Sequence, residues 1–133
     1  MKFIFRLLTL ISFTILLSSC DPAQNIDFIN KTESPVKIKI KINSNNTNWR
    51  LKEFVKGDSI VLEIRPKGTE SLYFGMGTWE ENEVDETVKS IDNIEIETED
   101  IKTIYKSRKS IAEILKNNRK GLWWKTNIEI EVE

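Results

Sequence analysis

The chain has 133 residues, of which 20 are Lys or Arg and 21 are Asp or Glu, so its formal net charge is −1. This balance disfavours nucleic acid as a partner, because phosphate binding relies on an excess of clustered basic residues. Histidine is absent and cysteine occurs once, which excludes Ser-His and Cys-His nucleophile pairs and removes the commonest ligands of transition metals. We therefore expect a protein that is not an enzyme and that has no metal or other cofactor.

The first 19 residues have the pattern of an exported chain. Lys2 and Arg6 give a positively charged start, and residues 7–17 then carry no charge. This order is typical of a signal peptide. The uncharged run is too short for a helix that crosses a bilayer, which needs about 20 residues. We therefore expect residues 1–19 to be a signal peptide that is removed.

The uncharged run ends in Leu17-Ser18-Ser19-Cys20, which resembles the lipobox of bacterial lipoproteins. The resemblance implies a diacylglyceryl group on the Cys20 thiol, cleavage by signal peptidase II after Ser19, and acylation of the new amino terminus, for example by palmitate. A sole cysteine also has no intramolecular disulfide partner. A secretory signal that ends near a cysteine, or a buried strand with a structural cysteine, would show only part of this pattern.

Residues 20–25 are expected to form the lipidated cysteine and a short polar tether, in which Pro22 disfavours a helix. Residues 26–133 then have the length of a single domain. Two or three acyl chains hold a protein far more tightly than one. The expected location is the cell envelope, on the membrane, with the domain facing the periplasm.

Apolar and polar residues alternate with a period of two in the next part of the chain, which is the pattern of strands with one buried face. The clearest strand is residues 36–42, where Val or Ile alternates with Lys. Turn-forming residues separate the segments. Six or seven short strands predict an all-β fold, a small antiparallel β-sandwich of Ig-like or similar type. The other expected strands, strong ones first, are 60–64, 72–76, 94–96, 26–29 and 49–54.

One short helix is expected near residues 110–119. Ser110 and Glu113 have the spacing of a capping box, Ile111 begins an apolar stripe, and Gly121 can end the helix. We expect this helix to cover an edge or an open end of the sandwich.

Five of the seven residues in segment 80–86 are acidic. Runs of like charge are usually exposed and mobile, so a solvated loop is expected here. The spacing does not match a calcium-binding EF-hand loop. Trp79 precedes the run, where it would either hold the base of the loop or contact a partner.

Residues 122–132 alternate as one long C-terminal strand. Trp124 then shares the inner face with Ile128, and Trp123 lies on the outer face among charged neighbours. Trp123 would either pack beneath the preceding helix or contact a partner. Trp123 and Trp79 are therefore the candidate partner-binding residues.

Asp58-Ser59-Ile60 resembles the short motif for periplasmic O-glycosylation in the Bacteroidetes, which implies a glycan on Ser59. The motif falls in an expected turn, where an enzyme could reach it. The alternative is a chance match, because a motif of only three residues occurs often in unrelated sequences.

These features predict a membrane-anchored lipoprotein of the cell envelope that serves as a non-enzymatic binding or accessory module for a protein or a glycan. A periplasmic immunity or inhibitor lipoprotein is the alternative, because small lipidated domains can neutralise toxins or hydrolases. A two-carboxylate hydrolase would need two acids that converge in a cleft, and no acidic residue interrupts an apolar face of the expected strands.

Overall fold

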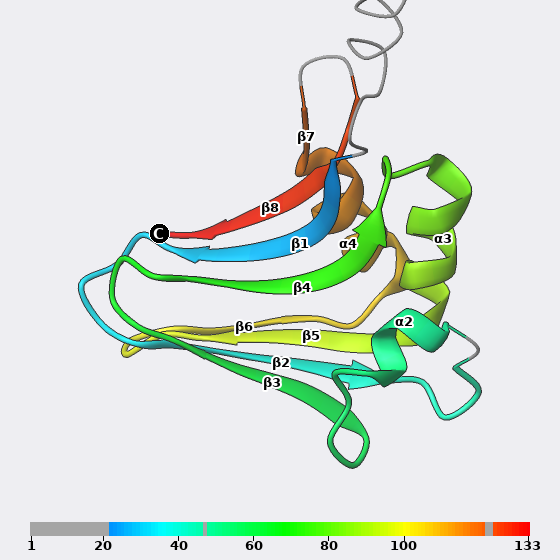
Figure 1. Cartoon of the computed structure of the whole chain (residues 1–133). Coiled ribbons are helices and arrows are strands. Elements are labelled where there is room, and N and C mark those ends of the chain that lie inside the picture. The colour runs from blue at the N-terminus through cyan, green and yellow to red at the C-terminus, as the bar shows by residue number, and fades with distance from the viewer. Residues whose placement is uncertain (1–21, 47, 122–123) are drawn as a thin grey trace, which may run out of the picture.

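The computed structural model describes residues 22–46, 48–121 and 124–133, which form two four-stranded sheets packed face to face (Figure 1). The expected β-sandwich is confirmed. The first sheet has the strand order β4-β1-β8-β7, and the second has the order β3-β2-β5-β6. The strands are β1 (Ala23–Asn30), β2 (Val36–Ile42), β3 (Ser59–Ile64), β4 (Thr69–Met76), β5 (Ile91–Glu97), β6 (Lys102–Tyr105), β7 (Arg119–Lys120) and β8 (Asn127–Val132).

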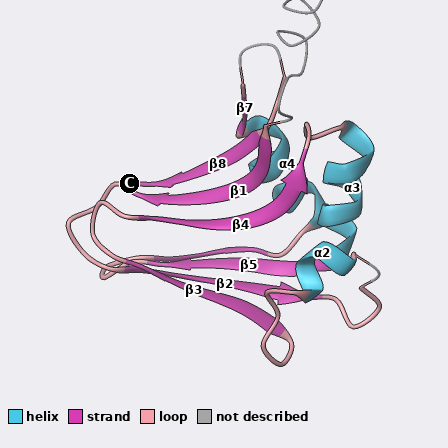
Figure 2. Ribbon diagram, in the orientation of Figure 1, coloured by secondary structure: helices cyan, strands magenta, loops and turns pink. Residues whose placement is uncertain are grey.

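Three helices lie together at one end of the sandwich (Figure 2). They are α2 (Trp49–Lys52), α3 (Glu81–Ser90) and α4 (Arg108–Asn117). The expected helix near residues 110–119 is confirmed as α4, with Ser107 rather than Ser110 as its N-cap. Ile111 and Leu115 on α4 are fully buried, so the helix covers this end of the core.

The core is built from the inward faces of the strands. In β2 every Val or Ile is buried and every Lys is exposed, as the alternation predicts. Ile26 and Phe28 of β1 and Ile128 and Ile130 of β8 supply the matching layer from the first sheet. Burial of a large aliphatic or aromatic side chain contributes about 1.5–3 kcal/mol, so this layer drives the packing of the two sheets.

The central pair of the first sheet is parallel. Strand β1 lies between β4, its antiparallel neighbour, and β8, which runs parallel to it with Ile26 opposite Ile128. A parallel pair needs a crossover connection, and here nearly the whole domain lies between the two strands. The first and last strands are therefore held side by side in the middle of one sheet.

The fold begins earlier than the expected boundary at residue 26. Strand β1 starts at Ala23, and Gln24 is only 1% exposed. Residues 23–25 therefore belong to the domain and not to a tether. The sequence conceals this because a polar glutamine occupies an inward position of the strand.

Two segments expected as strand or loop are helices. Residues 49–52 form α2 because the Asn48 side chain caps the helix and accepts a hydrogen bond of 3.2 Å from the backbone N–H of Arg50. The acidic run forms α3, in which Val84 and Val88 face the core. Acidic residues at the start of a helix are favourable because they lie near the positive end of its dipole, so the charge run did not require a loop.

The last strand is shorter than the expected segment 122–132. Strand β8 begins at Asn127, and Trp124 is 65% exposed instead of facing inward. Gly121 has a φ of 142°, and a Cβ atom there would lie 1.8 Å from the Trp124 carbonyl oxygen. The backbones of Gly121 and Trp124 therefore lie against each other, which one continuous strand from residue 122 would not allow. Trp123 lies outside the described residues.

A buried amide ties the two sheets together at the end opposite the helices. Asn30, at the end of β1, is fully buried, and its Nδ2 donates to the carbonyl oxygens of Ser34 (2.8 Å) and Arg65 (3.1 Å). Its Oδ1 accepts hydrogen bonds of 2.8 Å from both the backbone N–H and the hydroxyl of Thr32. One side chain thus joins β1 to the turns that lead into β2 and out of β3.

Replacement of Asn30 by Ala should destabilise the domain by about 1–3 kcal/mol, because buried carbonyl groups lose their donor. The measurement is urea unfolding of the detergent-solubilised protein, followed by tryptophan fluorescence. Asn45→Ala is the matched control, since Asn45 is exposed and should change stability by less than about 0.5 kcal/mol. Equal unfolding midpoints for the two variants would contradict the role assigned to Asn30.

Candidate functional site

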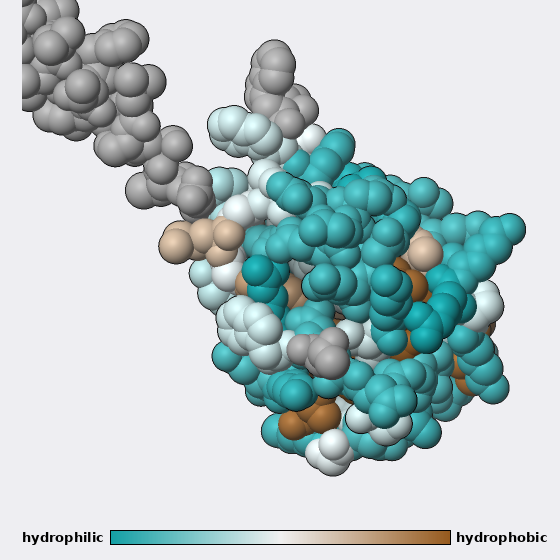
Figure 3. Space-filling model, turned by 90° about the vertical axis from the view of Figure 1, so that its right-hand side faces the viewer, coloured by the Kyte–Doolittle hydropathy of each residue, from teal (hydrophilic) through white to brown (hydrophobic). Residues whose placement is uncertain are grey.

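A polar pocket of about 430 Å³ opens at the helical end of the molecule. It lies between α2 and α3, and its lining includes Asn46, Trp49, Arg50, Trp79 and Glu83. Figure 3 faces this end and shows a surface that is mostly hydrophilic, with small apolar areas between the polar side chains. The volume is within the range of small-molecule sites, about 300–1,000 Å³.

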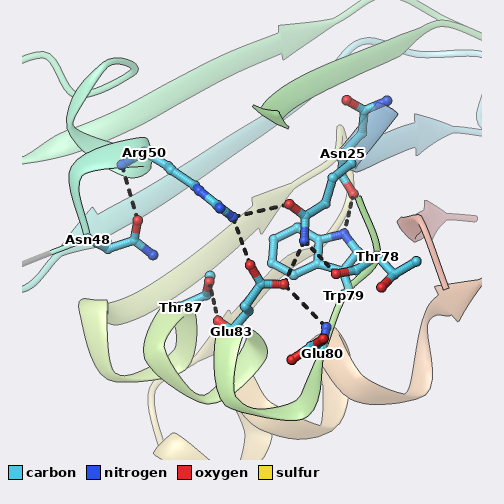
Figure 4. Close-up of polar contacts among 9 residues, drawn as sticks. Asn25, Asn48, Arg50, Thr78, Trp79, Glu80, Glu83 and Thr87 are labelled. Carbon is cyan, nitrogen blue, oxygen red and sulfur yellow. Dashed lines mark hydrogen bonds and ion pairs between the residues drawn. The ribbon is translucent and has the colours of Figure 1, made fainter. Parts of the chain in front are cut away.

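Three side chains from distant parts of the chain meet here: Arg50 and Glu83 line the pocket, and the buried Gln24 lies beneath them. Arg50 Nη1 lies 3.1 Å from Glu83 Oε1 and 3.1 Å from Gln24 Oε1 (Figure 4). Gln24 Nε2 donates to Glu83 Oε2 at 2.9 Å and to the Thr78 carbonyl oxygen at 3.1 Å. The amide, the guanidinium and the carboxylate therefore fix one another before any ligand arrives.

Local structure sets the position of each member. Asn48 caps α2, which directs Arg50 toward α3. Glu83 occupies the third position of α3, where its Oε2 also accepts a hydrogen bond of 3.3 Å from the Glu80 backbone N–H. Both oxygens of Glu83 are thus engaged within the protein. The arrangement suits a rigid binding floor better than a proton-transferring carboxylate.

Trp79 forms the apolar wall beside this floor. It is 3% exposed, its ring centroid lies 4.9 Å from that of Phe74, and its Nε1 donates to the Asn25 carbonyl oxygen at 3.0 Å (Figure 4). The sequence places Trp79 among the partner-binding candidates, but the structure makes it a core residue with only an edge at the pocket. The expectation that Trp79 holds the base of the next segment agrees with this position, although that segment is a helix.

The mouth of the pocket carries an exposed aromatic ring. Trp49 is 65% exposed, and the Arg50 guanidinium carbon lies 5.7 Å from the centroid of its ring. This distance allows a cation–π interaction, which orients the indole. The Asn45 and Asn46 residues add amide groups to the lining. The mouth therefore combines one flat apolar face with several hydrogen-bonding groups.

Of the remaining sequence candidates, only Ser59 is described, and it does not line this pocket. Cys20 and Trp123 lie outside the described residues. Ser59 begins β3, is 4% exposed, and donates its hydroxyl to Asp58 Oδ1 at 2.7 Å. The turn expected to present Ser59 ends one residue earlier, so in the folded domain this hydroxyl is not accessible to a glycosylating enzyme.

A charged cluster joins α3 to α4 behind the pocket. Lys116 Nζ lies 2.5 Å from Glu81 Oε1 and 2.8 Å from Asp85 Oδ1, and Arg119 Nη2 lies 3.1 Å from Glu81 Oε2. The hydrogen bond from Lys116 lowers the pKa of Glu81 and that of Asp85, and the same two carboxylates raise the pKa of Lys116. These pairs hold the acidic start of α3 against α4.

Replacement of Lys116 by Met should lower stability at neutral pH and have little effect in acid. In the folded protein the pKa values of Glu81 and Asp85 lie below their usual 4.5 and 3.8. The stability that the two carboxylates contribute is therefore fully present above these usual pKa values, and it is lost as the pH falls through the lower pKa values of the folded protein. The test is the urea midpoint of wild type and variant from pH 7 to pH 3.

Lys109→Met is the control, since it removes the same charge from α4 at an 85% exposed position that lies 4.0 Å from Glu113. Exposed pairs of this kind contribute little. A difference between wild type and Lys116→Met that stays constant over the whole pH range would show that the ion pairs are not its source.

No protein-family model matches the chain, and no significant match occurs among curated proteins or solved structures. In the described ranges, no group of three potential metal-ligating side chains occurs. None of the helices in the same part of the chain has the length and apolar character to cross a bilayer. What the site can do therefore follows from its own chemistry.

The sequence analysis did not single out Gln24, Arg50 or Glu83. Two local signals were available: Asn48 before an amphipathic turn, and Glu83 three residues after Glu80, the spacing of a capping box. No local signal marks Gln24, because only the tertiary fold brings it to Glu83, 59 positions away.

Proposed function

We propose that this chain is a membrane-anchored lipoprotein of the cell envelope that binds a polar ligand without chemical conversion, and that the pocket between α2 and α3 is its ligand site. The observation that carries the binding role is the pair of lining residues Arg50 and Glu83, which the buried Gln24 amide holds in place beside an exposed Trp49. Preorganised groups favour binding because little conformational entropy is lost when the ligand arrives.

The anchor rests on the sequence around Cys20. A charged start, an uncharged run and a Leu-Ser-Ser-Cys ending occur in the right order, and Cys20 is the sole cysteine. The position of β1 fits this reading, because the fold begins at Ala23 and so leaves the two residues 21–22 as the link to the lipidated cysteine.

A glycan is the ligand class that the pocket suits best. A sugar ring has one face of C–H groups, which packs on an indole such as Trp49, and hydroxyl groups around its rim, which bond to amides and charged side chains. Asn45, Asn46 and Arg50 supply such groups around the mouth. The cell envelope is rich in polysaccharide, so a module anchored there would meet such ligands.

Replacement of Cys20 by Ala should abolish incorporation of a clickable fatty acid and release the protein from the membrane fraction. Loss of the thiol removes the acceptor for the diacylglyceryl group, and acyl chains supply about 0.8 kcal/mol of binding per buried methylene. Ser18→Ala is the control, because Ala keeps the small side chain that the motif needs. A Cys20→Ala protein that remains acylated and membrane-bound would refute the anchor.

Replacement of Trp49 by Ala should weaken glycan binding at least tenfold, roughly 1.4 kcal/mol. The probes are soluble fragments of cell-wall glycan strands and neutral oligosaccharides, titrated against the detergent-solubilised protein by tryptophan fluorescence and calorimetry. Ile101→Ala is the control, since Ile101 is also 65% exposed but is not part of the pocket lining.

Failure of every glycan probe to bind, combined with capture of a protein toxin or hydrolase that depends on Trp49, would replace this proposal by the immunity or inhibitor function. Equal affinity of the Trp49→Ala variant and the wild type would remove the pocket from the glycan site.

A further inference from the structure

Two segments flank the start of β1, from which the chain leads back to Cys20. The first described residue, Pro22, accepts a hydrogen bond of 2.9 Å from the Gly77 backbone N–H. Ala23 pairs with Met76 at the end of β4, and the Asn25 backbone N–H donates to the Thr126 carbonyl oxygen at 3.2 Å. The exit of the chain is thus flanked by the end of β4 on one side and the segment before β8 on the other.

Three exposed apolar side chains belong to the segments that flank this exit. In the described residues, the exposed large apolar side chains are Trp49, Val61, Tyr73, Met76, Ile101, Ile104 and Trp124. Met76 is 70% exposed and pairs with Ala23, Tyr73 is 53% exposed and pairs with Asn25, and Trp124 lies directly before the segment that bonds to β1. Tyr and Trp are favoured where one side of a ring contacts lipid and the other contacts water.

Two lysines lie at the same end of the sheet, on the side of β8 and β7. Lys120 ends β7, Lys125 lies two residues before β8, and the Lys125 Nζ donates to the Gly121 carbonyl oxygen at 3.2 Å. Neither lysine forms an ion pair with a carboxylate in the part of the chain that the structure describes.

We propose that this anchor face, defined by Tyr73, Met76 and Trp124 with Lys120 and Lys125, lies on the surface of an anionic phospholipid bilayer. The inference rests on the proposed lipid anchor at Cys20. Three residue steps separate Cys20 from Ala23, and an extended chain spans at most about 3.6 Å per residue, so Ala23 stays within about 11 Å of the lipidated residue. This end of the sheet is thereby held close to the bilayer, where lysines are attracted to lipid phosphates over about one Debye length.

The bilayer contact fixes the orientation of the domain. With acyl chains alone, the domain would rotate freely about a short link. With Met76 and Trp124 inserted among the headgroups and two lysines above the phosphates, one end of the first sheet faces the membrane. The pocket between α2 and α3 then keeps a constant direction relative to the surface.

A spin label at Met76→Cys tests this contact. In the lipidated protein the Cys20 thiol is blocked, so the label attaches only to the new cysteine. Vesicles of phosphatidylglycerol and phosphatidylethanolamine carry the full lipidated chain, and power saturation compares the accessibility of the label to oxygen and to a water-soluble nickel complex. We expect a several-fold rise in the oxygen-to-nickel ratio relative to a label at Asp100→Cys, in the exposed β5–β6 turn.

Two further variants keep the result interpretable. A label at Tyr73→Cys should also show a raised oxygen-to-nickel ratio. Agreement between the two positions would show that the result does not come from a local effect at Met76. Charge reversal by Lys120→Glu with Lys125→Glu should return the ratio toward the Asp100 value while the protein still floats with the vesicles. Equal ratios in purely neutral phosphatidylcholine vesicles would overturn the role of the two lysines.

The outcomes separate the two levels of the proposal. A protein that is not acylated and does not float with vesicles overturns the anchor and this inference together. A protein that floats but has a Met76 label as accessible to nickel as the Asp100 label overturns the inference alone. Dipolar broadening between Met76 labels in detergent, without vesicles, would assign the face to contact between two copies of the chain and would likewise overturn the bilayer contact.

Discussion

Burial of the Gln24 amide is the constraint on which the helical end of this protein depends. An amide loses its hydrogen bonds to water when it is buried, at a cost of about 1–3 kcal/mol per unsatisfied group in proteins. Gln24 is 1% exposed, and its partners are Thr78, Glu83 and Arg50. Because these partners lie on the β4–α3 connection, α3 and α2, satisfying one amide brings four segments of the chain together. The floor of the pocket is a consequence of that requirement.

Strand β1 carries similar polar connections at both of its ends. Gln24 joins it to the helices, and Asn30 joins it to turns at the ends of β2 and β3. Between them, Ile26 and Phe28 are buried in the core. Apolar packing gives most of the stability, whereas the directional amide bonds select one register and one angle between the sheets. The same strand thus links the proposed anchor, the core and the pocket.

The sequence predicted the sandwich because apolar residues recur at every second position in a strand with one buried face, as they do in residues 36–42. It predicted α4 for the same kind of reason, since Ile111 and Leu115 lie one turn apart. It did not predict α2 or α3. The caps at Asn48 and Glu80 are weak local signals, and contacts with distant residues also hold α3: Lys116 pairs with Glu81 and Asp85, and Val84 packs in the core. The pocket is lined by Arg50 of α2 and Glu83 of α3, and Gln24 of β1 holds both in place. Periodicity within a segment carries no information about contacts between such distant segments.

The parallel pairing of β1 with β8 has a consequence for the order of events during folding. Ile26 and Ile128 face each other across adjacent strands, so the middle of the first sheet cannot close until β8 has been synthesised. Contacts between residues so distant in sequence form slowly, because a long loop must be ordered before they stabilise the chain. The second sheet, whose β2–β3 hairpin is local, can form much earlier. During synthesis β1 therefore lacks its parallel neighbour, and the first sheet stays open, until β8 emerges.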